Sequence, residues 1–162
     1  MHSPHSLVFH NGAVLTDHGF QTDVCVVVED GHIVSVLHGA PPASGEHIDL
    51  QGGYLVPGFI DVQVNGGGGV LFNNDTSVQA LATIAQGHRK YGTTGLLPTL
   101  ISDDAEVMQR AVAATHAAIT QGVPGVLGIH LEGPYIAPAR KGTHNADKFR
   151  VPDADEVAMV TA

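Results

Sequence analysis

The sequence has one cysteine, Cys25, and few basic side chains among its 162 residues. A single cysteine excludes an intrachain disulfide, and its place in the apolar run 24–28 predicts a small buried side chain, not a reactive thiol. Seven Lys and Arg against sixteen Asp and Glu give a formal net charge of −9. This acidic balance argues against a nucleic-acid partner.

Long apolar runs are also missing. No run approaches the ~20 residues that a membrane-spanning helix needs. The first residues also lack the basic and apolar regions of a secretory signal. A hydrophobic fraction of 43% with 14% charged residues is typical of a globular chain. We expect a cytoplasmic protein with no membrane partner.

The first part of the chain, residues 1–56, has the pattern of short β-strands separated by turns. Asp30-Gly31 lies between two apolar runs, which is a good short signal for a hairpin. Another turn is expected at Asn11-Gly12. These residues predict a small β-sandwich domain.

From residue 57 onward the pattern changes to strands alternating with helices. Strands are expected at 59–65, 94–100 and 126–132, helices at 77–91 and 104–120, and a further helix from 153. Asp103 and Glu106 resemble a capping box for the second helix. Alternating strands and helices predict an α/β fold with a parallel sheet. A (β/α)8 TIM-type barrel needs eight strands and ~250 residues. We therefore expect residues 57–162 to be a truncated, incomplete barrel of about three strands.

Polar side chains gather at the ends of two of these strands. Because side chains alternate along a strand, Gln63 and Asn65 share a face, as do His130 and Glu132. Gly133-Pro134 ends the last strand, which leaves Glu132 at its C-terminal lip. In parallel barrels that lip carries the chemistry, so we expect these groups to line a shared polar cavity.

Three segments together carry a resemblance to a known family. They are Pro-Gly-Phe-Ile-Asp-Val-Gln-Val-Asn-Gly at 57–66, His-Leu-Glu-Gly-Pro-Tyr at 130–135 and Lys-Gly-Thr-His at 141–144. In order and spacing they resemble the N-acetylglucosamine-6-phosphate deacetylases of the amidohydrolase superfamily. The resemblance covers essentially the whole sequence, which corresponds to less than the first half of a family member.

The resemblance implies hydrolysis of the acetamide of N-acetylglucosamine 6-phosphate to glucosamine 6-phosphate and acetate. It implies one divalent metal ion, usually zinc, with Glu132 as its carboxylate ligand. Thr143 and His144 match the segment that contacts the substrate, where His144 would polarise the amide carbonyl. The partner is a phosphorylated amino sugar, and the full-length protein would be a homodimer.

One departure and one gap accompany the resemblance. Many amidohydrolases have His-x-His where this chain has Gln63 and Asn65, and neutral amides are poor zinc ligands. We assign these two residues, with His130, to orienting water or supporting the metal ligands. The family's two histidine ligands and its general-base Asp have no match here. The chain alone is therefore expected to be inactive.

Other readings stay open at this point. A lone Glu132 would be read as a loop cap or as an ion-pair partner of Arg140 or Lys141, and the surrounding motif favours the ligand instead. The basic pair 140–141 favours simple solvation, with phosphate steering as the alternative. The glycine run 66–69 lacks the residues of a phosphate loop and favours a flexible loop. The alternatives for function are another amidohydrolase-superfamily deacetylase, a cyclic amidase, or a non-catalytic β-rich binding module.

Overall fold

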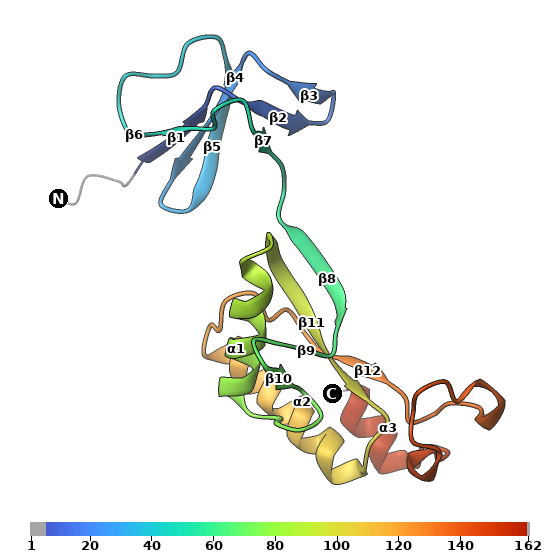
Figure 1. Cartoon of the computed structure of the whole chain (residues 1–162). Coiled ribbons are helices and arrows are strands. Elements are labelled where there is room, and N and C mark those ends of the chain that lie inside the picture. Colours follow the sequence, from blue (N-terminus) through green and yellow to red (C-terminus); the bar gives the residue numbers. More distant parts are fainter. Residues whose placement is uncertain (1–5, 162) are drawn as a thin grey trace. The chain divides into compact units, whose positions relative to one another are not determined.

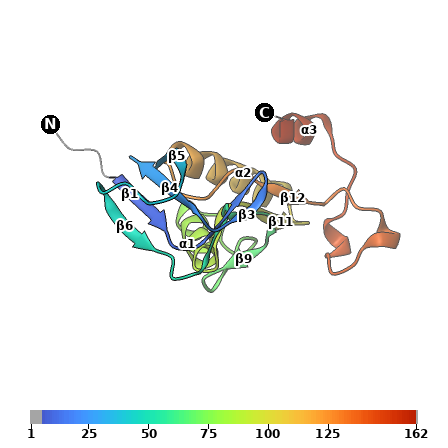
Figure 2. The same ribbon diagram turned by 90° about the horizontal axis from the view of Figure 1, so that it is seen from above.

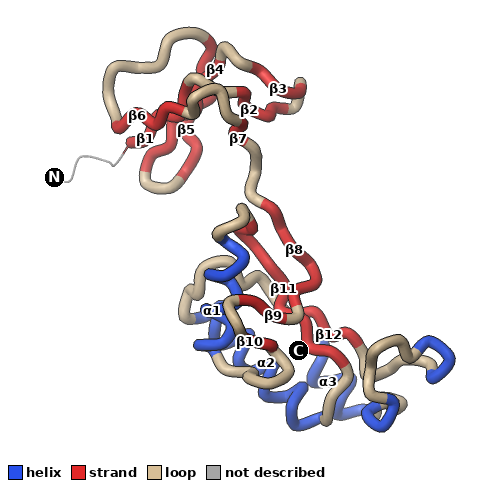
Figure 3. Tube along the Cα trace, in the orientation of Figure 1, coloured by secondary structure: helices blue, strands red, loops and turns tan. Residues whose placement is uncertain are grey.

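The computed structural model describes residues 6–161. The chain divides into two compact units, Met1–Pro57 and Gly58–Ala162. Figure 1 labels the elements of each unit, and Figure 3 shows that the first contains strands and loops while the second mixes strands with helices. The fold is therefore α/β, with an all-β unit before the α/β unit.

The all-β unit contains two sheets. One has the order β5-β4-β1-β6, formed by β5 (His32–His38), β4 (Val24–Glu29), β1 (Ser6–His10) and β6 (Glu46–Asp49). The other has the order β3-β2-β7, formed by β3 (Gly19–Gln21), β2 (Ala13–Thr16) and β7 (Tyr54–Leu55). Asp30 (φ 48°) and Gly31 (φ 81°) connect β4 to β5, so the predicted hairpin is confirmed. Cys25 is buried beside Val8 and Val27, as expected.

The α/β unit is built around a parallel sheet with the order β12-β11-β8. Its main elements in chain order are β8 (Phe59–Val64), α1 (Val78–Arg89), β11 (Thr93–Ile101), α2 (Ala105–Thr120), β12 (His130–Glu132) and α3 (Ala154–Thr161). Smaller elements are β9 (Gly66–Gly67), β10 (Val70–Leu71), and the 3-10 helices η1 (Pro138–Arg140) and η2 (Ala146–Lys148). Sequential strands are thus neighbours in the sheet. Figure 2 gives a second view, in which β11 and β12 are labelled side by side.

The core of this unit lies between the sheet and its first two helices. Leu81 and Ile84 of α1 and Met108 of α2 pack in one cluster with Leu96 and Leu100 of β11. Figure 1 shows α1 and α2 on the same side of the sheet. None of the helices described between residues 6 and 161 combines the length and apolar character that a membrane span requires.

The third predicted strand is much shorter than expected. β12 has three residues, and Val126 forms only an isolated bridge to Leu96. Residues 127–129 are not assigned to a strand, although the Leu127 N–H still donates to the Leu96 carbonyl at 3.1 Å. The Leu127 side chain is 56% exposed. The alternation of side chains therefore predicted a strand over 126–132, of which only His130–Glu132 form one.

The glycine run is a packed hairpin and not a free loop. β9 and β10 pair antiparallel, and the His88 ring Nε2 lies 2.9 Å from the carbonyl oxygen of Gly66. A Cβ on Gly67 would lie 2.8 Å from the His88 ring, closer than real Cβ atoms approach. Glycine is needed there because the hairpin lies directly against α1.

The predicted capping box on α2 is wrong. The N-cap is Asp104, and its side chain makes no capping hydrogen bond. The Asp103 carboxylate instead accepts from the Asp104 N–H and from the Asn73 side chain. The adjacent backbone N–H and the distant Asn73 side chain have therefore taken the carboxylate that the spacing assigned to a cap.

A buried threonine repairs the pairing between β8 and β11. The register of these strands shifts between Leu96 and Pro98, where proline has no N–H to donate. The Thr99 hydroxyl accepts from the Val64 N–H at 2.9 Å, so this buried donor is satisfied across the irregularity. The side chain takes the place of a backbone acceptor.

We predict that Thr99→Val, which preserves shape, lowers the free energy of unfolding of the α/β unit by about 1–3 kcal/mol, because a buried N–H loses its acceptor. Urea unfolding followed by helical circular dichroism measures the change. Thr115→Val is the matched control, since that equally buried hydroxyl donates only to the Ala111 carbonyl within α2. Equal losses in the two variants would contradict the proposed role of Thr99.

Candidate active site

Glu132 is the centre of a polar cluster at the C-terminal end of β12. Its Oε2 accepts a hydrogen bond from Gln63 Nε2 at 2.9 Å, and its Oε1 lies 3.4 Å from His144 Nε2. The Glu132 side chain is 34% exposed, whereas the His144 side chain is 6% exposed. Three residues singled out from the sequence are therefore brought together, with one face of the carboxylate open to solvent.

The bond between Gln63 and Glu132 spans the middle strand of the sheet. Gln63 is on β8 and Glu132 on β12, and β11 lies between them. Adjacent strands are about 4.8 Å apart, so the two backbones are separated by roughly twice that distance. Two long side chains that lean over β11 can close the gap, and a shorter residue at either position would leave it open.

His144 reaches the cluster from the loop after β12. Its backbone N–H donates to the Lys141 carbonyl at 3.1 Å, which closes a turn. Its ring is tilted against the Phe149 ring, with the two centroids 6.2 Å apart. The other ring nitrogen, Nδ1, lies 2.8 Å from the Ser102 hydroxyl. Ser102 directly follows β11, so its place at the same strand-end lip was readable from the sequence, yet it was missed.

The other predicted residues lie outside this cluster. The His130 ring Nδ1 is 3.3 Å from the Thr99 hydroxyl. Thr99 and His130 are paired residues of β11 and β12, further from the strand ends than Glu132. Within residues 6–161, the side chains of Asn65 and Thr143 are not hydrogen-bonded to Glu132 or His144. Asn65 contributes its carbonyl oxygen to the Phe72 N–H, and Thr143 is exposed.

The alternative reading of Glu132 as an ion-pair partner is not observed. Among the described residues, its polar contacts are with Gln63 and His144, and neither Arg140 nor Lys141 pairs with it. Both basic residues are exposed. The Gln63 contact fits the supporting position expected for that residue, whereas the contact of the His144 imidazole with the same carboxylate was not expected.

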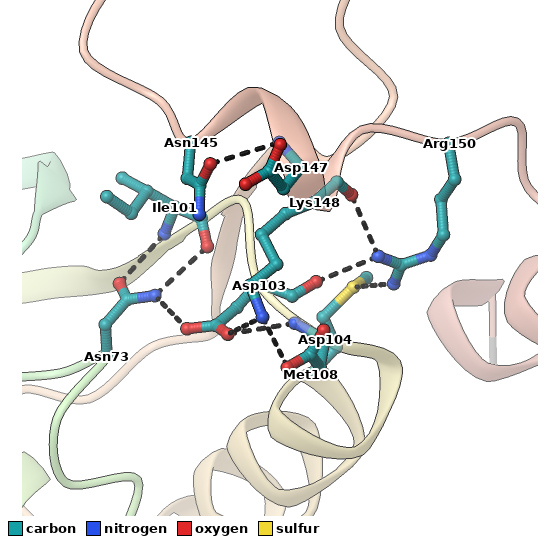
Figure 4. A network of polar contacts seen from close by, with 9 residues as sticks. All are labelled: Asn73, Ile101, Asp103, Asp104, Met108, Asn145, Asp147, Lys148 and Arg150. Carbon is teal, nitrogen blue, oxygen red and sulfur yellow. Dashed lines mark hydrogen bonds and ion pairs between the residues drawn. The ribbon is translucent and has the colours of Figure 1, made fainter.

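A second polar network fixes the end of β11 next to Ser102 (Figure 4). The Asn73 side-chain amide donates to the Ile101 carbonyl at 3.1 Å and to Asp103 Oδ2 at 2.9 Å. Its oxygen accepts from the Ile101 N–H at 3.1 Å. One side chain therefore satisfies both backbone groups of the last strand residue. Asn73 lies in an irregular segment with no periodic pattern, so the sequence gave no signal of this role.

The same network holds the loop that carries His144 (Figure 4). Lys148 donates to Asp104, and this hydrogen bond is the main cause that raises the pKa of Lys148 above its usual value. Arg150 donates to the Asp103 carbonyl at 2.9 Å and pairs with Glu156, whose hydrogen bond is the main cause that raises the Arg150 pKa. Both cations therefore stay charged at neutral pH and fasten the loop to the start of α2.

The fit of these residues to a metal ion is partial. Over residues 6–161, no group of three or more His, Cys, Asp or Glu side chains is placed to hold a metal. Glu132 and His144 are two side chains of these types that lie together, and the Gln63 amide beside them is a weak ligand for zinc. A catalytic zinc site normally takes about three protein ligands. The described residues could supply part of such a site and not all of it.

Comparisons with known proteins agree on one kind of enzyme. No protein-family profile matches the chain. The N-acetylgalactosamine-6-phosphate deacetylase of Shewanella sp. (strain ANA-3) is 44% identical over 142 residues, which are 85% of this chain and 36% of that protein. The N-acetylglucosamine-6-phosphate deacetylase of Haemophilus influenzae is 36% identical over 141 residues, covering 86% of this chain and 37% of that protein.

Solved structures give the same result. The crystal structure of N-acetylglucosamine-6-phosphate deacetylase from Pasteurella multocida matches with a TM-score of 0.91 and 35% identity, over 96% of this chain and 41% of that chain. A mutant deacetylase from Mycobacterium smegmatis, solved with N-acetyl-D-glucosamine-6-phosphate, matches with a TM-score of 0.80 and 30% identity, over 98% and 40%.

The chain is thus related to deacetylases of phosphorylated N-acetyl sugars. The resemblance to the N-acetylglucosamine-6-phosphate deacetylases is confirmed over most of its 162 residues. The chain spans 36–41% of the length of the four relatives described above.

We predict that Asn73→Ala lowers the free energy of unfolding by about 1–3 kcal/mol, because the partly buried backbone groups of Ile101 at the end of β11 lose their hydrogen-bond partner. Urea titration measures the loss. Asn74→Ala is a matched control, since the neighbouring Asn74 is exposed and only its backbone is hydrogen-bonded. A control variant that is destabilised as much as Asn73→Ala would show that the loop, and not the side-chain network, is responsible.

Proposed function

We propose that the chain forms part of a deacetylase that hydrolyses the acetamide of N-acetylglucosamine 6-phosphate, giving glucosamine 6-phosphate and acetate. The observation that carries this proposal is the meeting of Gln63, Glu132 and His144 at one strand-end lip. The relatives named as deacetylases of this sugar phosphate support the choice of substrate.

We assign the α/β unit to the first three strand–helix repeats of a (β/α)8 barrel, and the first unit to a small β-sandwich domain with its boundary near residue 57. The sequential strand order, with α1 and α2 on one side, supports the barrel. So does the exposure of Ile60 (65%) and Val62 (62%) on β8, because strands of parallel sheets are normally covered on both faces.

The roles follow from position. Glu132 is assigned as one ligand of a divalent metal, with zinc the expected ion, because its carboxylate is half-open at the lip. When bound, such an ion lowers the pKa of a water ligand towards ~7 and polarises a carbonyl. His144 presents Nε2 beside Glu132 and is assigned to the amide carbonyl of the substrate, with Thr143 next to it in the exposed turn.

The remaining predicted residues support this centre. Gln63 orients the Glu132 carboxylate through its hydrogen bond. Asn65 and His130 are assigned to water or to supporting positions near it. The chain by itself is expected to be inactive, since it supplies only part of a metal site. A cytoplasmic location, expected from the composition of the sequence, and assembly as a homodimer, implied by the resemblance, stay predictions.

A second candidate substrate is N-acetylgalactosamine 6-phosphate. It is favoured by the Shewanella relative, which is 44% identical to this chain, against 36% for the Haemophilus protein named for the glucosamine sugar. The two substrates carry the same acetamide and phosphate, so one strand-end cluster serves either reaction. Other amidohydrolase deacetylases and cyclic amidases remain as the wider alternatives, beside a non-catalytic binding module.

The complete protein is expected to release acetate from a 6-phosphorylated N-acetylhexosamine and not from the unphosphorylated sugar. Acetate release from N-acetylglucosamine 6-phosphate, N-acetylgalactosamine 6-phosphate, N-acetylglucosamine and a cyclic amide would be compared at equal concentration. The ratio of kcat/KM for the two sugar phosphates decides between the two candidates. Turnover of the cyclic amide alone, or of none of the four, would contradict the proposal.

Glu132→Ala in the complete protein is expected to abolish tight zinc binding, because a site of about three ligands loses one. Metal analysis after dialysis measures the content. His144→Ala is the comparison variant, which should lower turnover by a factor of ~100 or more and keep the metal. Full zinc content in the Glu132 variant would refute the ligand assignment.

A further inference from the structure

The His144 ring is buried between two groups that both restrict where its proton sits. A neutral imidazole carries its hydrogen on Nδ1 or on Nε2, and the other nitrogen accepts. On the Nδ1 side, the Ser102 backbone N–H points at the ring at 3.4 Å. A backbone N–H can only donate, so Nδ1 must be the acceptor there.

The Ser102 hydroxyl makes the shorter contact on the same side, with Oγ 2.8 Å from Nδ1. Among the residues that the structure describes, this buried hydroxyl has no other hydrogen-bond acceptor, so its hydrogen is satisfied only when it donates to a bare Nδ1. Ser102 and His144 are both buried, so the hydroxyl has little competition from water.

The opposite nitrogen leads to the same tautomer. Nε2 lies 3.4 Å from Glu132 Oε1, and an ionised carboxylate only accepts. A hydrogen on Nε2 makes this contact attractive, whereas a hydrogen on Nδ1 would place two acceptors face to face at Glu132 and would point at the Ser102 backbone N–H. Both ends of the ring therefore select the Nε2–H form.

We propose that Ser102 is a positioning residue that fixes His144 as the Nε2–H tautomer, so that the ring offers a hydrogen-bond donor at the strand-end lip. In its purpose this inference rests on the proposed function: the donor would bind the carbonyl oxygen of the acetamide. Its physical content, the position of one proton, does not depend on which amide is hydrolysed.

The surroundings keep the serine hydroxyl in place. A Cβ on Gly133 would lie 2.2 Å from Ser102 Oγ, so glycine with its φ of 89° leaves the space that the hydroxyl occupies. On the other side, the preceding residue Ile101 is held by Asn73 through both its N–H and its carbonyl. Ser102 therefore has little freedom to turn away from the ring.

The position of the proton can be read directly by nuclear magnetic resonance. Long-range nitrogen–proton correlation spectra of the chain labelled with ¹⁵N-histidine distinguish the protonated from the bare ring nitrogen, and His144→Gln identifies the signal. We expect the Nε2–H tautomer in the unaltered protein at neutral pH. Finding Nδ1–H as the main form would overturn the inference without any serine variant.

Ser102→Ala then tests the hydroxyl. The ratio of Nε2–H to Nδ1–H should fall by about fivefold, the change expected for the loss of one net hydrogen bond. Ser102→Thr, which keeps a hydroxyl, should restore the ratio, and Thr115→Ala, a buried hydroxyl in α2, should leave it unchanged. An unchanged ratio in Ser102→Ala would overturn the role.

Activity separates this inference from the proposed function. In the complete protein, Ser102→Ala should lower kcat with little effect on metal content. A tautomer shift in a protein that hydrolyses no acetamide would refute the proposed function and leave the positioning role intact. Normal deacetylase activity with no tautomer shift would refute the positioning role alone.

Discussion

The parallel pairing of β11 with both of its neighbours is the constraint on which the rest of the α/β unit depends. Thr99 pairs with His130 and Ile101 with Glu132, while Pro98 lies opposite Val64. This register brings the carboxyl ends of three strands to one edge. Beside the register shift at Pro98, the Val64 N–H donates to the Thr99 hydroxyl, so this buried donor is not left unsatisfied.

The edge created in this way gathers polar groups that are far apart in the chain. Gln63, Ser102 and Glu132 come from the ends of β8, β11 and β12, and His144 is brought back by the loop fastened through Lys148 and Arg150. Among the residues that the structure describes, no buried side-chain nitrogen or oxygen lacks a hydrogen-bond partner. The cluster is therefore preorganised: its members hold their geometry before any ligand arrives.

Sequence reasoning located the parts of the site that follow from strand periodicity and from motifs. The positions of Gln63, Glu132 and His144 were predicted, and they do meet; their chemical roles stay predictions. The position of Ser102 directly after β11 was readable, but its contact with His144 was not. Asn73 was missed because it acts through a tertiary contact that leaves no period in the sequence. The false capping box has the same origin, since Asn73 and the Asp104 N–H engage the carboxylate that was expected to cap α2.

Two neutral hydroxyls do much of the organising in this unit, and their neutrality has a consequence. Thr99 and Ser102 each supply a hydrogen bond at a point where the backbone ladder ends or breaks, and neither adds a charge beside Glu132. A lysine or arginine in place of either would neutralise the carboxylate at close range and weaken its attraction for a cation. Gln63 follows the same rule, since its amide orients Glu132 while leaving its charge in place. The arrangement therefore fixes the direction of the carboxylate and of the imidazole while it preserves the negative charge that a metal ion or a proton donor would require.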